Sequence, residues 1–64
     1  MTNSAGIKRQ HVLDLMMEDG FGPDEVIEHA AEYAKVITGT RPSTTAVTRV
    51  QQIARAIINE VRAS

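Results

Sequence analysis

The chain has 64 residues, with seven Lys and Arg against eight Asp and Glu, and it contains no Cys. A chain of this length buries only about 60% of the surface that its unfolded form exposes, so we expect one small domain, residues 1–64. Without Cys it has no disulfide and no thiolate metal site. No apolar run approaches the roughly 20 residues that span a bilayer. The first ten residues lack the apolar segment of a signal peptide, so the sequence predicts a cytoplasmic protein without a membrane contact.

The first predicted helix spans residues 4–19. Asn3 or Ser4 can cap its N-terminus by accepting a hydrogen bond from an unpaired backbone N–H. Gly20 suits the left-handed position that ends a helix, and Phe21 should then contact the preceding turn. The apolar side chains of this helix cover an arc wider than one partner helix buries.

The second predicted helix spans residues 23–38. Gly22 serves as its N-cap, and Pro23 suits the first helical position, where no backbone N–H is needed. Gly39 ends the helix. Its apolar face is rich in alanine, and its opposite face is acidic: Glu25, Glu28 and Glu32.

The third predicted helix spans residues 43–63 and is about 30 Å long. Ser43 follows a proline and is the natural N-cap. Apolar residues recur at spacings of three and four, as expected for one buried helix face: Val47, Val50, Ala54, Ile57 and Val61.

No segment alternates between apolar and polar residues as a strand does, so the sequence predicts an all-α protein. Short connections favour antiparallel neighbours, and we expect a small antiparallel three-helix bundle. Its predicted core comprises Val12, Leu13, Met16, Phe21, Ile27, Ala30, Ala34, Ile37, Val47, Val50, Ala54, Ile57 and Val61. The apolar arcs exceed what this core uses, which favours a homodimer or a partner-bound chain. The surplus apolar residues are Leu15, Met17, Ile53 and Ile58.

The near-zero net charge conceals two oppositely charged halves. Residues 10–33 hold seven carboxylates and no Lys or Arg, whereas residues 34–64 hold five basic side chains against Glu60 alone. Such an asymmetry can steer a partner or orient self-association. The simplest interpretation is a solvated surface with loose ion pairs, each worth ~0–1 kcal/mol.

The sequence argues against an enzyme. It has no cysteine nucleophile, no nucleophile elbow and no glycine-rich phosphate loop. The two histidines, His11 and His29, are most simply solvated helix residues, because a metal or catalytic role needs supporting ligands around them. We therefore predict no cofactor, no metal and no catalytic residue.

The favoured function is a non-enzymatic helical protein that binds a protein partner as an inhibitor, adaptor or regulator. Phages and mobile elements encode small acidic inhibitors of this kind. The acidic residues Glu25, Glu28 and Glu32 would set orientation and partner choice. The surplus apolar residues Leu15, Met17, Ile53 and Ile58 would form the buried contact.

Two alternatives remain open. Gly20 and Phe21 resemble the turn of a helix-turn-helix, but the helix at residues 23–38 would then turn four carboxylates towards DNA phosphates, which is electrostatically unfavourable. A DNA-binding regulator would instead use the third helix, with phosphate contacts from Arg49, Arg55 and Arg62. The other alternative is a structural assembly subunit, for example in a virion.

Overall fold

The computed structural model describes residues 6–63, and all regular structure in that range is helical. The described residues form four helices: α1 (Arg9–Asp19), α2 (Pro23–Glu28), α3 (Ala30–Thr38) and α4 (Thr44–Ala63). Between residues 6 and 63 no strand occurs, so the all-α prediction is confirmed.

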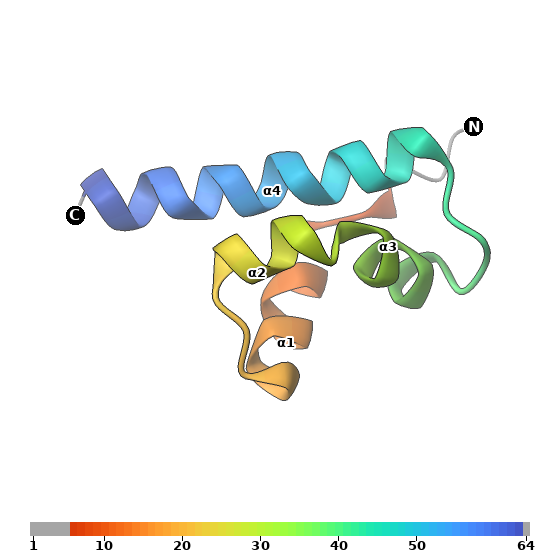
Figure 1. Cartoon of the computed structure of the whole chain (residues 1–64), viewed down its shortest axis with the longest axis horizontal. Coiled ribbons are helices and arrows are strands. Elements are labelled where there is room, and N and C mark those ends of the chain that lie inside the picture. The colour runs from red at the N-terminus through yellow and green to blue at the C-terminus, as the bar shows by residue number, and fades with distance from the viewer. Residues whose placement is uncertain (1–5, 64) are drawn as a thin grey trace.

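The long helix α4 organises the domain, which measures 35 × 22 × 18 Å (Figure 1). It packs mainly against α2 and α3, and α1 makes a smaller contact with it. In Figure 1, α2 runs alongside α4 in the opposite direction, while α1 points away from α4 and α3 is seen nearly end-on. The prediction of a small all-α domain is thus confirmed, but the described residues form four helices instead of three, and α1 points away from α4 instead of lying alongside it.

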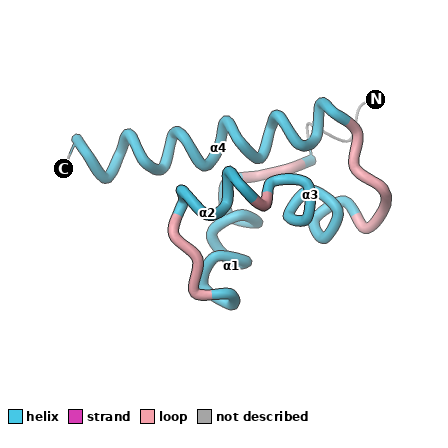
Figure 2. Tube along the Cα trace, in the orientation of Figure 1, coloured by secondary structure: helices cyan, strands magenta, loops and turns pink. Residues whose placement is uncertain are grey.

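The predicted helix at residues 23–38 is divided at His29, where the chain turns between α2 and α3 (Figure 2). His29 has φ −110° and ψ 25°, well away from helical values. Its N–H still bonds to the carbonyl groups of Glu25 and Val26, at 3.0 and 3.2 Å, and its own carbonyl accepts from Tyr33 at 3.1 Å. The junction is thus a hydrogen-bonded kink. Neither proline nor glycine stands at this position, so the sequence gives no signal for it.

The other helix ends follow their local signals. Gly20 has φ 70°, the left-handed conformation predicted for it, and Gly39, predicted to end its helix, has φ 74°. Gly22 precedes Pro23 at the start of α2, and the Gly22 N–H donates to the Glu25 carboxylate at 3.2 Å. Ser43 caps α4, because its Oγ accepts from the Ala46 N–H at 3.1 Å.

The start of α1 differs from the prediction. The helix begins at Arg9 with Lys8 as N-cap, whose N–H donates to His11 Nδ1 at 3.3 Å. Asn3 and Ser4 lie outside the described residues. Ile7 is buried in the core from an extended stretch before the helix, so this part of the chain contributes through packing and not through helix formation.

The core combines one face of α4 with apolar residues of the other elements. Its buried members are Ile7, Val12, Val26, Ala30, Tyr33, Ala34, Ala46, Val50, Ile53, Ala54 and Ile57. Most of the remaining predicted core residues are half-buried around this cluster: Leu13, Met16, Phe21, Ile27, Ile37 and Val47. The prediction for Val61 is wrong, since this side chain is 68% exposed.

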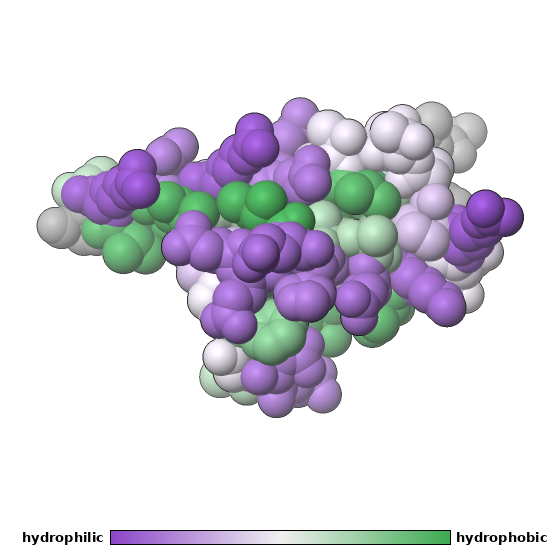
Figure 3. Space-filling view, in the orientation of Figure 1, coloured by the Kyte–Doolittle hydropathy of each residue, from purple (hydrophilic) through white to green (hydrophobic). Residues whose placement is uncertain are grey.

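Val61 is exposed because α4 is longer than the elements that cover it. The C-terminal end of α4 projects past α2 in Figure 1, and the hydrophobic surface along α4 continues to this end in Figure 3. Arg9 and Glu60 connect the start of α1 to this part of α4 through a two-pronged ion pair, in which Arg9 Nη2 lies 2.7 Å from Glu60 Oε1. The hydrogen bond from the guanidinium lowers the pKa of Glu60.

Candidate functional site

Two adjoining depressions lie between α1 and α3. The first has a volume of about 340 Å³, and its lining residues are Leu15, Asp19, Phe21, His29, Glu32, Tyr33 and Val36. The second has a volume of about 190 Å³, and its lining residues are His11, Asp14, Leu15, Val36 and Ile37. Because Leu15 and Val36 line both, the depressions form one continuous surface, which we call the α1–α3 groove.

The end of the groove near the first turn is built from three rings. The left-handed Gly20 ends α1, and the Phe21 N–H then bonds to the Met16 carbonyl at 3.1 Å. This turn places the Phe21 ring against His29, with centroids 5.2 Å apart and planes inclined by 28°. The Tyr33 ring lies on Phe21 at 6.3 Å and 17°. The kink at His29 and the turn at Gly20 therefore meet in one aromatic cluster.

The apolar part of the groove is accessible to a partner. Val36 is 64% exposed, so most of this aliphatic side chain is open to solvent. Leu15 and Ile37 are half-buried beside it, so each presents part of its surface. Contact with a partner would remove this apolar area from water, which contributes roughly 25 cal/mol per Å² buried.

The charged groups of the groove are acidic. Asp14, Asp19 and Glu32 line it, and within residues 6–63 no lysine or arginine lines either depression. All three carboxylates are exposed. His29 Nδ1 lies 3.2 Å from Glu32 Oε1, so this carboxylate is held at the mouth of the larger depression.

Tyr33 is the unusual member of the groove. Its side chain is 3% exposed, and its hydroxyl oxygen has no hydrogen-bond partner among the described residues. Burial raises the pKa of Tyr33 to about 12. The Asp19 carboxylate adds to this shift through its charge and through a hydrogen-bond-like approach to the hydroxyl, and the charge of Glu25 adds a smaller part. Asp19 is thus close to the hydroxyl without meeting it in hydrogen-bonding geometry. The phenol is neutral at neutral pH and has unused hydrogen-bonding capacity.

The structure separates the predicted acidic residues. Glu25 and Glu28 lie on α2, whereas Glu32 lies on α3 beyond the kink and lines the groove. All three are exposed, but they do not form one continuous helical ridge, because the axis turns at His29. Glu32 is grouped instead with Asp19 of α1.

The predicted apolar contact residues are also separated. Leu15 lines the groove, while Met17, two positions later and 83% exposed, points to another side of α1. Ile58 is half-buried on α4. Ile53 is 5% exposed within the core, so its assignment to a partner surface is wrong. It shares the stripe of Val50 and Ile57, which α2 and α3 cover.

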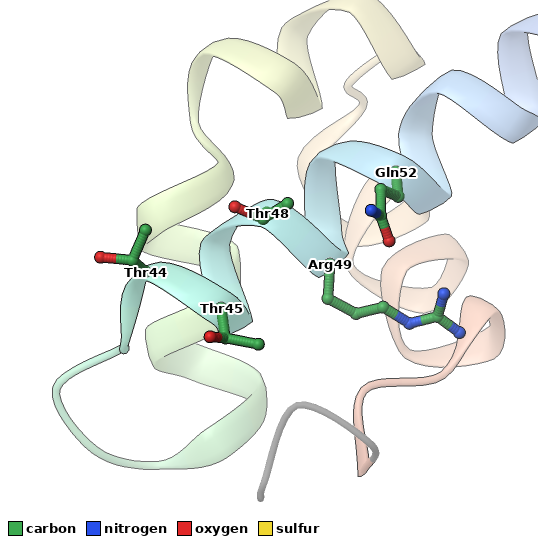
Figure 4. A pocket seen from close by; sticks show the side chains of 5 residues that line it. All are labelled: Thr44, Thr45, Thr48, Arg49 and Gln52. Carbon is green, nitrogen blue, oxygen red and sulfur yellow. The ribbon is translucent and has the colours of Figure 1, made fainter.

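A second polar surface lies on the outward face of α4. A depression of about 330 Å³ near the start of this helix is lined by Thr44, Thr45, Thr48, Arg49 and Gln52 (Figure 4). The three predicted phosphate-contacting residues, Arg49, Arg55 and Arg62, are all exposed. The described part of α4 contains one carboxylate, Glu60, which is paired with Arg9.

The sequence does not identify several residues of the groove as site residues: Asp14, Asp19, Phe21, Tyr33 and Val36. The spacing of His29 and Tyr33, one helical turn apart, was the available signal for the aromatic cluster. The contribution of Phe21 and Asp19 depends on how α1 meets α3, which the pattern along either helix does not specify.

No group of three His, Asp or Glu side chains within residues 6–63 is arranged to hold a metal ion. In the same range no helix combines the length and the apolar character needed to cross a membrane. Comparison of the chain with protein-family models, with curated proteins and with solved structures finds no match.

Proposed function

We propose that this protein is a small non-enzymatic interaction protein that binds a protein partner through the α1–α3 groove. The observation that carries the proposal is an exposed aliphatic residue, Val36, beside a rim of carboxylates to which no basic side chain of the described residues contributes. The apolar contacts would supply most of the affinity, and the acidic rim would set orientation and the rate of association. Glu25 and Glu28, exposed on the neighbouring α2, extend the acidic field that a basic partner meets.

The groove predicts a specific loss of binding on substitution. Val36→Lys removes the exposed aliphatic contact and reverses the local charge, and Ala56→Lys places the same charge on the exposed face of α4. Both are surface changes within about 0.5 kcal/mol of neutral for stability. In affinity capture from nuclease-treated lysate, the wild type and Ala56→Lys should retain a protein that Val36→Lys loses. The same retained proteins for all three would contradict the proposal.

Self-association is a separate part of the proposal. Met17 and the half-buried Ile58 are the predicted dimer contacts that the chain's own core leaves accessible. The substitutions Met17→Asp and Ile58→Asp should each convert a dimer into a monomer, since a carboxylate in an apolar contact is strongly unfavourable. Light scattering measures the mass, and circular dichroism should show helicity close to wild type. An unchanged mass in both variants would refute the dimer.

The outward face of α4 supports DNA binding as a second candidate. This face is exposed and carries Arg49, Arg55 and Arg62 with hydroxyl and amide side chains between them, a composition that suits phosphate contacts and base edges. If it binds DNA, an electrophoretic shift of duplex DNA should appear at low salt and weaken steeply with added salt. Arg55→Gln should reduce the salt dependence by about one phosphate contact. Absence of any shift at low salt would remove this candidate.

A further inference from the structure

The larger depression of the α1–α3 groove brings together groups that recognise a particular kind of cation. Asp19 of α1 and Glu32 of α3 place two exposed carboxylates on one opening. The rings of Phe21, His29 and Tyr33 form its aromatic side, with their planes inclined by less than 30° to one another across each contact. A planar cation can pair with such carboxylates at its edge and stack on aromatic rings with its face.

The buried hydroxyl of Tyr33 is an independent indication of a ligand. A hydroxyl oxygen has two acceptor sites and one donor, yet this one has no hydrogen-bond partner among the described residues. Leaving a buried hydroxyl unpaired costs stability, so native structures rarely do so without a reason. The carboxylate of Asp19, near this hydroxyl, lines the same depression. A hydrogen-bond donor bound at Asp19 would therefore be within reach of the hydroxyl after a small side-chain movement.

We propose that this depression receives an arginine side chain of the protein partner, with its guanidinium paired to Asp19 and Glu32 and stacked on Phe21. The assignment rests on the proposed function of the groove and names the chemistry of its partner. Arginine fits better than lysine because its guanidinium is planar, presents five N–H donors and is less strongly hydrated than an ammonium group. The volume of about 340 Å³ is several times the ~30 Å³ that a water molecule occupies in the liquid, which leaves room for the group.

The test is a titration of the ¹⁵N-labelled protein with N-acetyl-arginine amide at constant ionic strength, followed by amide chemical shifts. Shifts should saturate and map to the residues around Asp19, Phe21 and Tyr33. N-acetyl-lysine amide should bind at least about fivefold more weakly, since it lacks the planar fork. Shifts of equal size with both probes would overturn the proposal, because they would show only a general response to cations.

Matched variants separate the site from the overall acidity. Glu32→Gln should weaken binding of the arginine probe about threefold, in the range of an exposed ion pair. Glu18→Gln makes the same charge change at an exposed position of α1, outside the lining of the depression, and should leave binding unchanged. Tyr33→Phe keeps the ring and should weaken binding about threefold through the lost hydrogen bond. Equal losses in Glu32→Gln and Glu18→Gln, or no loss in Tyr33→Phe, would contradict the assignment.

The two levels of the proposal fail in different ways. If the groove binds a partner that carries no arginine at this position, capture by the wild type is still lost in Val36→Lys while the arginine probe does not bind. If a second copy of the chain supplies the arginine through Arg55 or Arg62, addition of the probe lowers the mass measured by light scattering, which would overturn the assignment to a separate partner. Without any differential capture, the proposed function itself fails.

Discussion

Replacing Ile53 with alanine should leave much of the chain unfolded at 25 °C. The side chain is 5% exposed and belongs to the cluster through which α4 packs on α2 and α3. Truncation of a buried isoleucine to alanine costs about 2–5 kcal/mol, from lost transfer free energy and from the cavity left behind. A core of this size rarely supplies more than about 3–5 kcal/mol in total. The loss is therefore comparable with the whole free energy of unfolding.

The measurement is urea unfolding followed by circular dichroism at 222 nm. Ile58→Ala is the matched control, because it makes the same kind of truncation five residues later on α4, where the side chain is only half-buried. Its unfolding midpoint should fall much less than that of Ile53→Ala. Equal midpoints for the two variants would mean that Ile53 does not belong to the core.

Ile53 also shows which features of α4 its apolar periodicity predicts and which it does not. The apolar arc of α4 was correctly predicted, but its centre was not, since the stripe through Val50 and Ile57 includes Ile53 and excludes Val61. Periodicity gives the width of the apolar face of α4. Which residues lie at the centre of that face depends on where α2 and α3 pack against it. The length of α4 beyond those neighbours then decides that Val61 is exposed.

Helix ends were predictable wherever a local rule determines them. Gly20 and Gly39 adopt the left-handed conformation that glycine accepts without a steric cost, and Ser43 offers a hydroxyl to the first turn of α4. The division at His29 has no such signal. Neither glycine nor proline stands there, and the kink coincides with stacking of the His29 ring on Phe21, a contact between elements. The burial of Ile7 likewise depends on contacts between elements, so no local sequence pattern predicts it.

The acidic charge of the candidate site was predictable from the sequence, but the set of residues that line it was not. The acidic character of residues 10–33 is evident from the sequence, and the carboxylates that line the groove all come from this segment. Their grouping was not evident, because Asp19 and Glu32 become neighbours only through the packing of α1 on α3. The kink at His29 places Glu32 on α3, whereas Glu25 and Glu28 lie on α2. A pattern within one helix therefore identified the charge and missed the site.

Tyr33→Phe should make the protein more stable, which is the opposite of most substitutions in a core. The change keeps the ring and its stacking on Phe21, and it removes a buried hydroxyl that has no partner among the described residues. A buried unpaired hydroxyl costs about 1–3 kcal/mol in proteins, so we expect a gain of about 1 kcal/mol in the free energy of unfolding at pH 8.

The same variant should change the response to alkali. The pKa of Tyr33 is raised to about 12 in the folded protein, against an ordinary value of 10. Between these values the unfolded chain loses the phenol proton while the folded protein keeps it. The wild type therefore loses stability as the pH rises from 10 towards 12, and the contribution of the neutral phenol is complete only below pH 10. Phenylalanine does not titrate, so the stability advantage of Tyr33→Phe should widen over this interval.

Urea unfolding of both proteins at pH 8 and at pH 11 tests the two effects together. The two proteins share every other ionisable group, so the effect of those groups cancels in the difference between them. A lower stability of Tyr33→Phe at pH 8 would mean that the hydroxyl has a partner in the folded protein. A difference that stays constant between pH 8 and pH 11 would mean that burial does not raise the pKa. The predicted combination, a stabilised variant whose advantage grows with pH, requires a hydroxyl that is both buried and unpaired, which is also the property that the proposed arginine pocket uses.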